Sequence, residues 1–298
     1  MQNVLYYKYV PIDDPISFRD HHQQLCDSLQ LKGKVLVAKE GINGCVSGTE
    51  EDTLRYIEEL RKDSRFSDVE CKITSTSYHD FKRMIVRIRD QIVTAKFPVD
   101  ITKKAPYVEP TQLREWFDHH EEMVLIDARN DYESKIGKFE HAITPSLQTF
   151  SEWKKYVDHL HIPKNKRIIT YCTGGIRCEK ASAYLQEKGF TNVFQLHGGI
   201  INYGKECGNA HWQGKCFVFD DRVAIDIDSR NSTEPITTCV CCNLPSAEYH
   251  NCALRECDDR FICCPSCLEK RKGCCSKKCL NEFQKKNYYQ EVITLKSR

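Results

Sequence analysis

Eleven of the eighteen cysteines in this chain lie between Cys239 and Cys279. The opening stretch, MQNVLYYKYVPIDDP, has neither a basic segment nor an apolar one after it, so we expect no secretory signal peptide. No apolar run reaches the length of a membrane span, so we expect no membrane association. Together these features predict a cytoplasmic protein with reduced thiols. In that compartment a dense cysteine cluster indicates metal binding or catalysis.

Eight cysteines of the cluster form four spaced pairs, a pattern typical of two tetrahedral metal sites with four thiolates each. The pairs are Cys239 and Cys242, Cys252 and Cys257, Cys264 and Cys267, and Cys275 and Cys279. We expect two structural zinc ions, the first and third pairs sharing one ion and the second and fourth pairs the other. Cys241, Cys263 and Cys274 lie beside pair members, which leaves the ligand register open by one residue. Iron–sulfur ligation is one alternative, and a disulfide framework is disfavoured by the odd number of cysteines.

The length of 298 residues suits two or three domains. Residues 1–94 predict a small α+β domain, because strand-like and helix-like segments follow one another in the ferredoxin-like order β-α-β-β-α-β. Residues 95–110 are rich in proline and lack periodicity, so they predict a linker. Residues 111–205 alternate helices with apolar strands, which predicts a parallel sheet with helices on both faces. We expect a connecting arm over 206–235 and the cysteine-rich module over 236–298.

The segment CTGGIR, residues 172–177, lies between an apolar strand and a helix. Ligands of such sheets bind beyond the carboxyl ends of the strands, where Cys172 is located. The helix N-terminus and the loop N–H groups favour an anion, and Gly174 and Gly175 let the backbone curl. A thiol in this position reacts as a thiolate, with Arg177 stabilising further negative charge. The alternative is a strand–helix connection with a buried, inert cysteine.

The size of this loop helps to choose its ligand. Four residues separate Cys172 from Arg177, one fewer than in the Cys-x5-Arg loop of cysteine phosphatases, so the loop suits a group close to a sulfur atom in size. Cys178 follows directly and has two interpretations. It is a redox partner that forms a disulfide with Cys172, or it is a small packing residue of the first helical turn; we favour packing.

Residues 111–205 resemble a rhodanese domain. LIDARNDYE (125–133) resembles the strand-end motif of that family, CTGGIR its active loop, and LHGGI (196–200) its closing segment. The resemblance implies that Cys172 forms a persulfide. It implies that the loop backbone cradles this group and that three charged residues support the scaffold. The cradle comprises Thr173, Gly174, Gly175, Ile176 and Arg177, and the supporting residues are Asp127, Arg129 and Glu133.

Three segments in order resemble the rhodanese-domain tRNA uridine hydroxylase family: EGINGCVSGT (40–49), CTGGIR and GKCFVFDDRV (214–223). The resemblance implies conversion of the wobble uridine of tRNA to 5-hydroxyuridine, with molecular oxygen as a substrate and the loop cysteine essential. We find no fingerprint of an organic cofactor in the sequence, and the oligomeric state is left open. Two alternatives remain: a sulfurtransferase carrying a persulfide on Cys172, and a zinc-containing RNA-binding protein with an inactive rhodanese fold.

A tRNA substrate requires a local basic surface, because the formal net charge is only +2. The RNA-binding candidates are Lys82, Arg83, Arg87 and Arg89. Arg87 and Arg89 alternate with apolar residues and therefore share one face of a strand. Tyr78 and Phe81 lie close by and offer stacking surfaces. An ordinary solvated sheet face explains the same pattern equally well.

Overall fold

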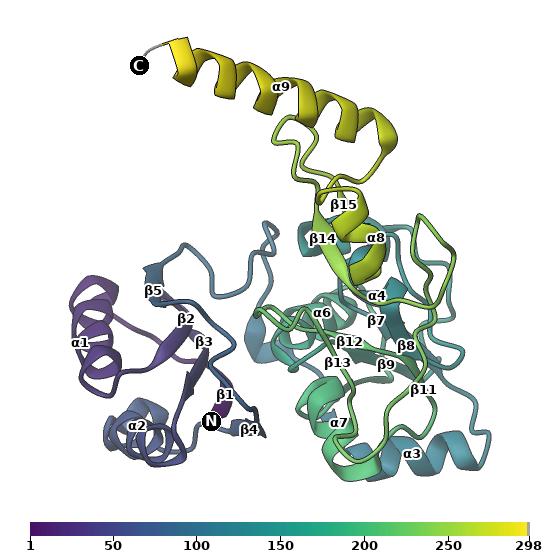
Figure 1. The fold of residues 1–298 in the computed structure, drawn as a ribbon. Coiled ribbons are helices and arrows are strands. Elements are labelled where there is room, and N and C mark those ends of the chain that lie inside the picture. Colours follow the sequence, from purple (N-terminus) through teal and green to yellow (C-terminus); the bar gives the residue numbers. More distant parts are fainter. Residues whose placement is uncertain (297–298) are drawn as a thin grey trace.

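The computed structural model describes residues 1–296 as two α/β bodies joined to a small cysteine-rich module (Figure 1). The final two residues of the module predicted over 236–298 lie outside the described part. In residues 1–296, no helix combines the length and the apolar character that crossing a bilayer requires. The predicted fold class is confirmed: an N-terminal α+β domain, a central domain with a parallel sheet, and a C-terminal cysteine cluster.

The N-terminal body is a five-stranded sheet with the strand order β4-β1-β3-β2-β5. Its elements are β1 Gln2–Tyr9, α1 Pro15–Ser28, β2 Lys32–Ala38, β3 Gly41–Gly48, α2 Glu50–Lys62, the 3-10 turn η1 Ser64–Phe66, β4 Cys71–Ser75 and β5 Met84–Ile88. The first four strands of that order form the predicted ferredoxin-like sheet, and β5 extends it in parallel beside β2. Asp14 and Thr49 cap the two helices through their side-chain oxygens.

Both helices of this body cover the sheet face turned away from the central domain (Figure 1). Val4, Tyr6, Val35 and Val46 alternate along their strands and form the core beneath the helices. The intervening residues of the same strands point to the opposite face. That face is turned toward the central body, so the sheet separates a hydrophobic core from an interdomain surface.

The central body contains a four-stranded parallel sheet with the order β6-β10-β9-β7. Its elements are η2 Ile101–Lys103, β6 Tyr107–Val108, α3 Pro110–Asp118, β7 Val124–Asp127, α4 Asp131–Ile136, β8 Gly137–Phe139, η3 Phe150–Glu152, α5 Trp153–Asp158, β9 Ile168–Tyr171, α6 Ile176–Glu187, β10 Val193–Leu196 and α7 Gly199–Cys207. Ile126 and Ile168 belong to one buried cluster, and Leu125 and Ile169 to another. Helices therefore cover both faces of this sheet, as alternating strand residues require.

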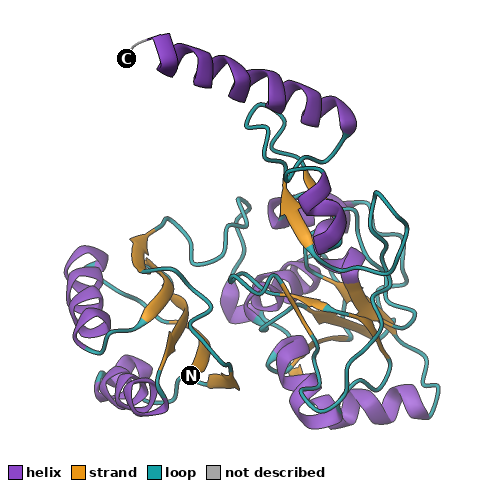
Figure 2. Ribbon diagram, viewed as in Figure 1, coloured by secondary structure: helices purple, strands orange, loops and turns teal. Residues whose placement is uncertain are grey.

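The segment after α7 is mostly loop and runs over the central body before it reaches the cysteine-rich module (Figure 2). Short strands pair along it: β11 Trp212–Gly214 with β8, β12 Cys216–Phe217 with β13 Ala224–Ile225, and β14 Tyr249–Asn251 with β15 Arg260–Ile262. The module ends with α8 Pro265–Lys270 and α9 Lys277–Lys296. Figure 1 shows α9 extending away from the rest of the chain.

The start of α7 lies directly against the loop that follows β9. The N–H groups of Ile200 and Ile201 donate to the carbonyl oxygens of Cys172 and Thr173 at 3.0 and 3.1 Å. This approach requires glycine at position 199, where φ is +68° and an added Cβ would collide with both of those oxygens. The backbone of the Cys172 loop is therefore fixed by the helix that begins at Gly199.

Replacing Gly199 by alanine is expected to lower the free energy of unfolding by about 3 kcal/mol, because backbone strain and overpacking add. Gly189 is the matched control, since φ is +83° there but an added Cβ would meet open space. Gly189→Ala should cost about 1 kcal/mol, from the backbone conformation alone. Urea unfolding followed by tryptophan fluorescence measures both variants, and equal losses would contradict the close approach at Gly199.

Candidate active site

Cys172 lies at the junction of β9 and α6 and is completely buried. The N–H of Gly175 donates to its Sγ at 3.2 Å. Gly175 has a φ of +100° and immediately precedes the first residue of α6. The sulfur atom therefore lies at the positive end of a twelve-residue helix, within reach of a loop N–H group.

The charge state of Cys172 reflects opposing effects. Burial by itself raises the pKa of the thiol, but hydrogen bonds from Cys178 and from loop N–H groups, together with the charge of Arg177, outweigh it and lower the pKa below the ordinary value. Burial raises the pKa of Cys178, and its contact with Cys172 raises that pKa further. The pair thus favours a thiolate on Cys172 beside a neutral Cys178, which lies completely buried in the first turn of α6.

Arg177 lies beneath the loop in a buried ion pair with Glu133. Its two terminal nitrogens donate to the two carboxylate oxygens at 2.5 and 2.8 Å. Glu133 also accepts from the backbone N–H of Asn130 at 3.1 Å and so ties the start of α4 to the loop. Because the carboxylate already balances its charge, Arg177 holds the loop in shape and adds less free positive charge than the sequence alone suggests.

Asp127 and Arg129 form a second buried ion pair. The Arg129 Nε lies 2.9 Å from one Asp127 oxygen, and Nη2 lies 2.6 Å from the other. Nη2 also donates to the carbonyl oxygen of Gly137 at 2.6 Å. The pair therefore links the last residue of β7 to the first residue of β8.

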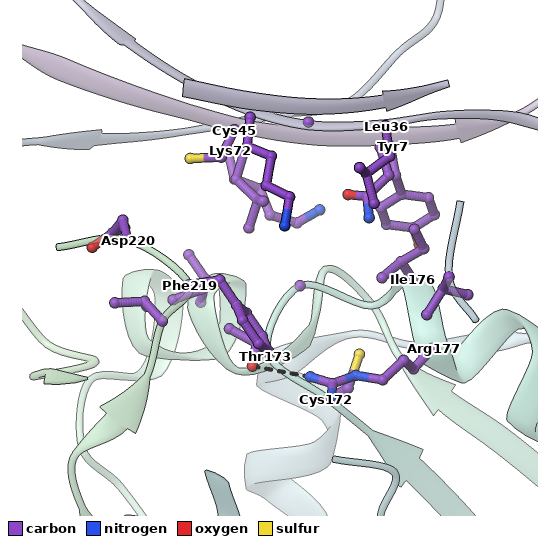
Figure 3. Close-up of a pocket in the computed structure, with 18 of the residues that line it drawn as sticks. Tyr7, Leu36, Cys45, Lys72, Cys172, Thr173, Ile176, Arg177, Phe219 and Asp220 are labelled. Atoms are coloured by element: carbon purple, nitrogen blue, oxygen red, sulfur yellow. Dashed lines mark hydrogen bonds between the residues drawn. The ribbon is translucent and has the colours of Figure 1, made fainter. Parts of the chain in front are cut away.

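A cavity of about 440 Å³ lies over Cys172, and three separate parts of the chain line it (Figure 3). The N-terminal sheet forms one wall, the 172–177 loop forms the opposite wall, and the arm around Phe219 forms a side. The glycines of the loop lie against the sheet. An added Cβ on Gly174 would be 3.0 Å from Leu5, and one on Gly175 would be 3.0 Å from the hydroxyl of Tyr7. Side chains at these positions would crowd Leu5 and Tyr7 of the N-terminal sheet.

Polar contacts fix the N-terminal sheet on α6. Tyr7 donates to the Glu179 carboxylate at 2.9 Å, and Tyr107 donates to the same oxygen at 2.5 Å. Lys180 is almost fully buried and pairs with both oxygens of Glu40 at 2.9 Å. The turn at Glu40 is therefore an interdomain anchor, a role that its sequence did not indicate.

The arm is attached to the N-terminal domain through Arg222. Its Nε lies 3.2 Å from buried Asp80 and 2.9 Å from Asp220. Asn3 donates to the same Asp80 carboxylate at 2.5 Å. These contacts hold Phe219 at the cavity with 62% of its side chain exposed. The arm is thus a wall of the site, whereas its sequence predicted only a connection.

Sequence reasoning missed the cavity residues of the N-terminal domain. On its strands these are Asn3, Leu5, Tyr7, Lys34, Leu36, Lys72 and Thr74. Their only sequence signal is the two-residue periodicity of the strands, which marks a second sheet face without saying what covers it. Asn43 and Cys45 also line the cavity, and they lie in the 40–49 segment that carries the family resemblance.

The RNA-binding candidates Lys82, Arg83, Arg87 and Arg89 are all exposed. In the described structure none of the four lines the cavity. Arg87 lies opposite Leu36 in the pairing of β5 with β2, so its side chain is on the cavity face of the sheet, at the outer edge. The other three lie on or next to the same edge strand.

The paired cysteines of the C-terminal module converge in two groups. Cys239, Cys242, Cys264 and Cys267 form one group, and Cys252, Cys257, Cys275 and Cys279 form the other; within each, the sulfur atoms lie within 4.8 Å of one another. Tetrahedral coordination at about 2.3 Å separates sulfur atoms by about 3.8 Å. The Cys242–Cys264 and Cys257–Cys275 separations of 3.8 and 3.6 Å fit that geometry. Both groups could therefore bind a metal ion.

The structure also contains an alternative set of ligands for the first metal site. Cys239, Cys241 and Cys263 form a third group, with Cys263 3.8 Å from both of the others. Cys239 belongs to two groups, so the metal ligands of the first site depend on which neighbours it shares an ion with.

Family models match three consecutive segments of the chain. An acylphosphatase-like domain named UPF0176 matches residues 1–92, a rhodanese-like domain residues 109–206, and a rhodanase C-terminal domain residues 213–280. A tRNA uridine(34) hydroxylase of Cytophaga hutchinsonii is 40% identical over 96% of this chain and 92% of the relative. One of Bacillus licheniformis is 44% identical over 87% and 82%.

The chain belongs to the tRNA uridine(34) hydroxylase family. Among solved structures, the rhodanese-like domain of an Anabaena protein is 19% identical, covers 37% of this chain and 79% of its own, and has a TM-score of 0.32. The relatives confirm the family resemblance inferred from CTGGIR and its two companion segments. In this member of the tRNA uridine(34) hydroxylase family, all three segments contribute residues to the lining of one cavity.

The lowered pKa of Cys172 predicts that its alkylation by iodoacetamide reaches half its maximal rate at a lower pH than an ordinary cysteine requires. Cys71 is the internal comparison, since burial raises the pKa of its thiol. Mass spectrometry of the two peptides across a pH series measures both midpoints. A Cys172 midpoint above that of Cys71 would contradict the geometry of the loop.

The two four-cysteine groups predict two metal ions per chain in protein purified under reducing conditions. Cys242→Ser should remove one ion, because three thiolates bind the metal more weakly than four. Its neighbour Cys241 is the matched control, and Cys241→Ser should retain both. Elemental analysis by mass spectrometry counts the ions; loss in Cys241→Ser with retention in Cys242→Ser would shift the register to the third group.

Proposed function

We propose that this protein hydroxylates the wobble uridine of tRNA at C5, giving 5-hydroxyuridine. One observation carries the proposal: relatives named tRNA uridine(34) hydroxylase are 40–44% identical over most of the chain. The similarity runs through the N-terminal domain, the loop and the arm, so it includes all three walls of the cavity. The reaction makes this chain an oxidoreductase with tRNA as its substrate.

We propose Cys172 as the central catalytic residue of this hydroxylation. Its lowered pKa and its position at the N-terminus of α6 support a reactive thiolate. Molecular oxygen is the proposed second substrate, without an organic cofactor. One oxygen atom is inserted into the C5–H bond, and the other leaves as water, formed with two electrons and two protons that an external reductant and the solvent supply.

The anticodon loop reaches the cavity, in this proposal, over the β5 edge of the N-terminal sheet. Arg87 supports this route, because it is exposed on the cavity face at that edge. Lys82, Arg83 and Arg89 lie close to it along the chain and supply further cations for phosphate groups. Apolar lining at Leu36 suits an unstacked base better than a phosphate.

The C-terminal cysteine groups are proposed to hold two structural zinc ions. Four thiolates per group and no other ligand type suit zinc in a closed coordination shell. The module buries few large apolar side chains, so metal binding supplies stability that its core lacks. The same abundance of free thiols supports a reducing location, the cytoplasm.

A sulfurtransferase with a persulfide on Cys172 is the second candidate. The match to a rhodanese-like domain and the N–H group aimed at the sulfur favour it. It differs from hydroxylation in its product, since a sulfur atom is transferred to an acceptor and no oxygen is added to uridine.

Deletion of the gene is expected to remove 5-hydroxyuridine and its derivatives from tRNA, in a strain without a redundant pathway. Wild-type protein should restore the nucleoside, and Cys172→Ser should restore none. Cys207→Ser is the matched control, because Cys207 is buried on the opposite side of the central sheet and should restore it fully. Mass spectrometry of tRNA nucleosides provides the readout. Normal 5-hydroxyuridine in the deletion strain would refute hydroxylation, and loss of thiolated nucleosides alone would favour sulfur transfer.

A further inference from the structure

We propose that the ammonium group of Lys72 binds the C4 carbonyl oxygen of the uracil base, so that the N-terminal domain selects the base that reaches Cys172. The inference rests on the proposed function, since it assumes that a uridine enters the cavity. Lys72 would be a specificity-determining residue contributed by a different domain from the reactive cysteine.

Strand register places Lys72 in a row of cavity residues. Leu5 of β1 lies opposite Cys45 of β3 on one side and Lys72 of β4 on the other. Lys34 of β2 lies opposite Cys45 in turn. Directly paired residues share a sheet face, and all four line the cavity. The row therefore ends in one lysine on each side.

Of these two lysines, Lys72 is the one held against the cysteine loop. Gly174 of the loop lies against Leu5, one strand away from Lys72. An added Cβ on Gly198 would be 3.0 Å from Lys72 Cε, and Gly199 follows against the carbonyl of Cys172. The Lys72 ammonium lies 5.4 Å from the centre of the Tyr7 ring. Figure 3 shows the side chain reaching from the sheet into the cavity.

Among the described side chains, those of residues 1–286, none forms a hydrogen bond or an ion pair with the ammonium of Lys72, although the residue is only partly exposed. Removal from water lowers its pKa, and a partly desolvated cation without an acceptor costs free energy. Lys180 shows how the same fold treats a buried lysine, since it pairs with Glu40. An unpaired lysine that faces the reactive thiolate therefore points to an acceptor supplied by a ligand.

The lining around Lys72 favours a base over a phosphate group. Leu5, Leu36 and Ile176 make much of the wall apolar, and the exposed ring of Phe219 offers a stacking surface. An ammonium group only donates hydrogen bonds. It therefore suits the C4 carbonyl oxygen of uracil and is mismatched with cytosine, which carries an amine at C4; the C2 carbonyl oxygen is common to both bases.

The experiment measures binding, so it requires neither oxygen nor a reductant. Full-length protein is titrated against fluorescent anticodon stem-loop RNA carrying uridine, 2-thiouridine, 4-thiouridine or cytidine at position 34. Lys72→Met should weaken binding of the uridine RNA by about tenfold, the effect of one charge-assisted hydrogen bond. Lys72→Arg should restore part of the loss.

Sulfur is a poor hydrogen-bond acceptor and cytosine carries an amine at C4. The 4-thiouridine and cytidine RNAs should therefore bind wild type and Lys72→Met equally, whereas the 2-thiouridine RNA should show the full loss. Lys34→Met is the matched variant from the other end of the row, and any loss it causes should be the same for all four RNAs. An equal Lys72→Met loss on all four RNAs would mean a phosphate contact and would overturn the inference. No loss on any of them would overturn it as well.

Measurements of tRNA nucleosides in cells distinguish failure of this inference from failure of the proposed function. Lys72→Met should lower the 5-hydroxyuridine content of tRNA in the complemented deletion strain while the protein remains folded, as thermal unfolding can verify. Failure of the wild-type protein to restore 5-hydroxyuridine would refute the proposed function. Full restoration by both wild type and Lys72→Met would refute only the role of Lys72.

Discussion

The contact between the N-terminal sheet and the two glycines of the cysteine loop determines the geometry of the whole site. Gly174 and Gly175 let the backbone curl around Cys172. Because they have no side chains, they also let Leu5 and Tyr7 pack directly against the loop. The first role follows from the loop alone. The second requires another domain, and it turns the surface over the Cys172 loop into a cavity lined by both bodies. The ion pair between Lys180 of α6 and Glu40 then holds the N-terminal body against the central one.

Local patterns predicted the parts of the fold in which local rules decide the structure. The order of strand-like and helix-like segments identified the N-terminal sheet, and apolar strands between helices identified the central one. The cysteine spacing also favoured the crossed arrangement of pairs, in which Cys239 and Cys264 belong to one group and Cys252 and Cys275 to the other. Spacing is informative there because a small module has few ways to bring four thiolates together.

The sequence could not predict which distant residues meet over Cys172. Lys72 and Phe219 are separated along the chain by the entire central domain, and neither belongs to a motif that implies the other. Arg177 illustrates a related limit. Its place in the loop suggested a free positive charge, yet Glu133 binds it in the folded chain, because a buried guanidinium needs a carboxylate. Such pairings depend on the tertiary arrangement and leave no local pattern.

The substrate base is proposed to occupy a cavity formed by residues that are far apart in the sequence. Photo-crosslinking of the full-length protein to an anticodon stem-loop with 5-bromouridine at position 34 tests this most directly. Mapped crosslinks should fall in the N-terminal strands that carry Tyr7 or Lys72 and also in the arm at Phe219. Crosslinks confined to the C-terminal module, or to the outer helices α1 and α2, would contradict the claim.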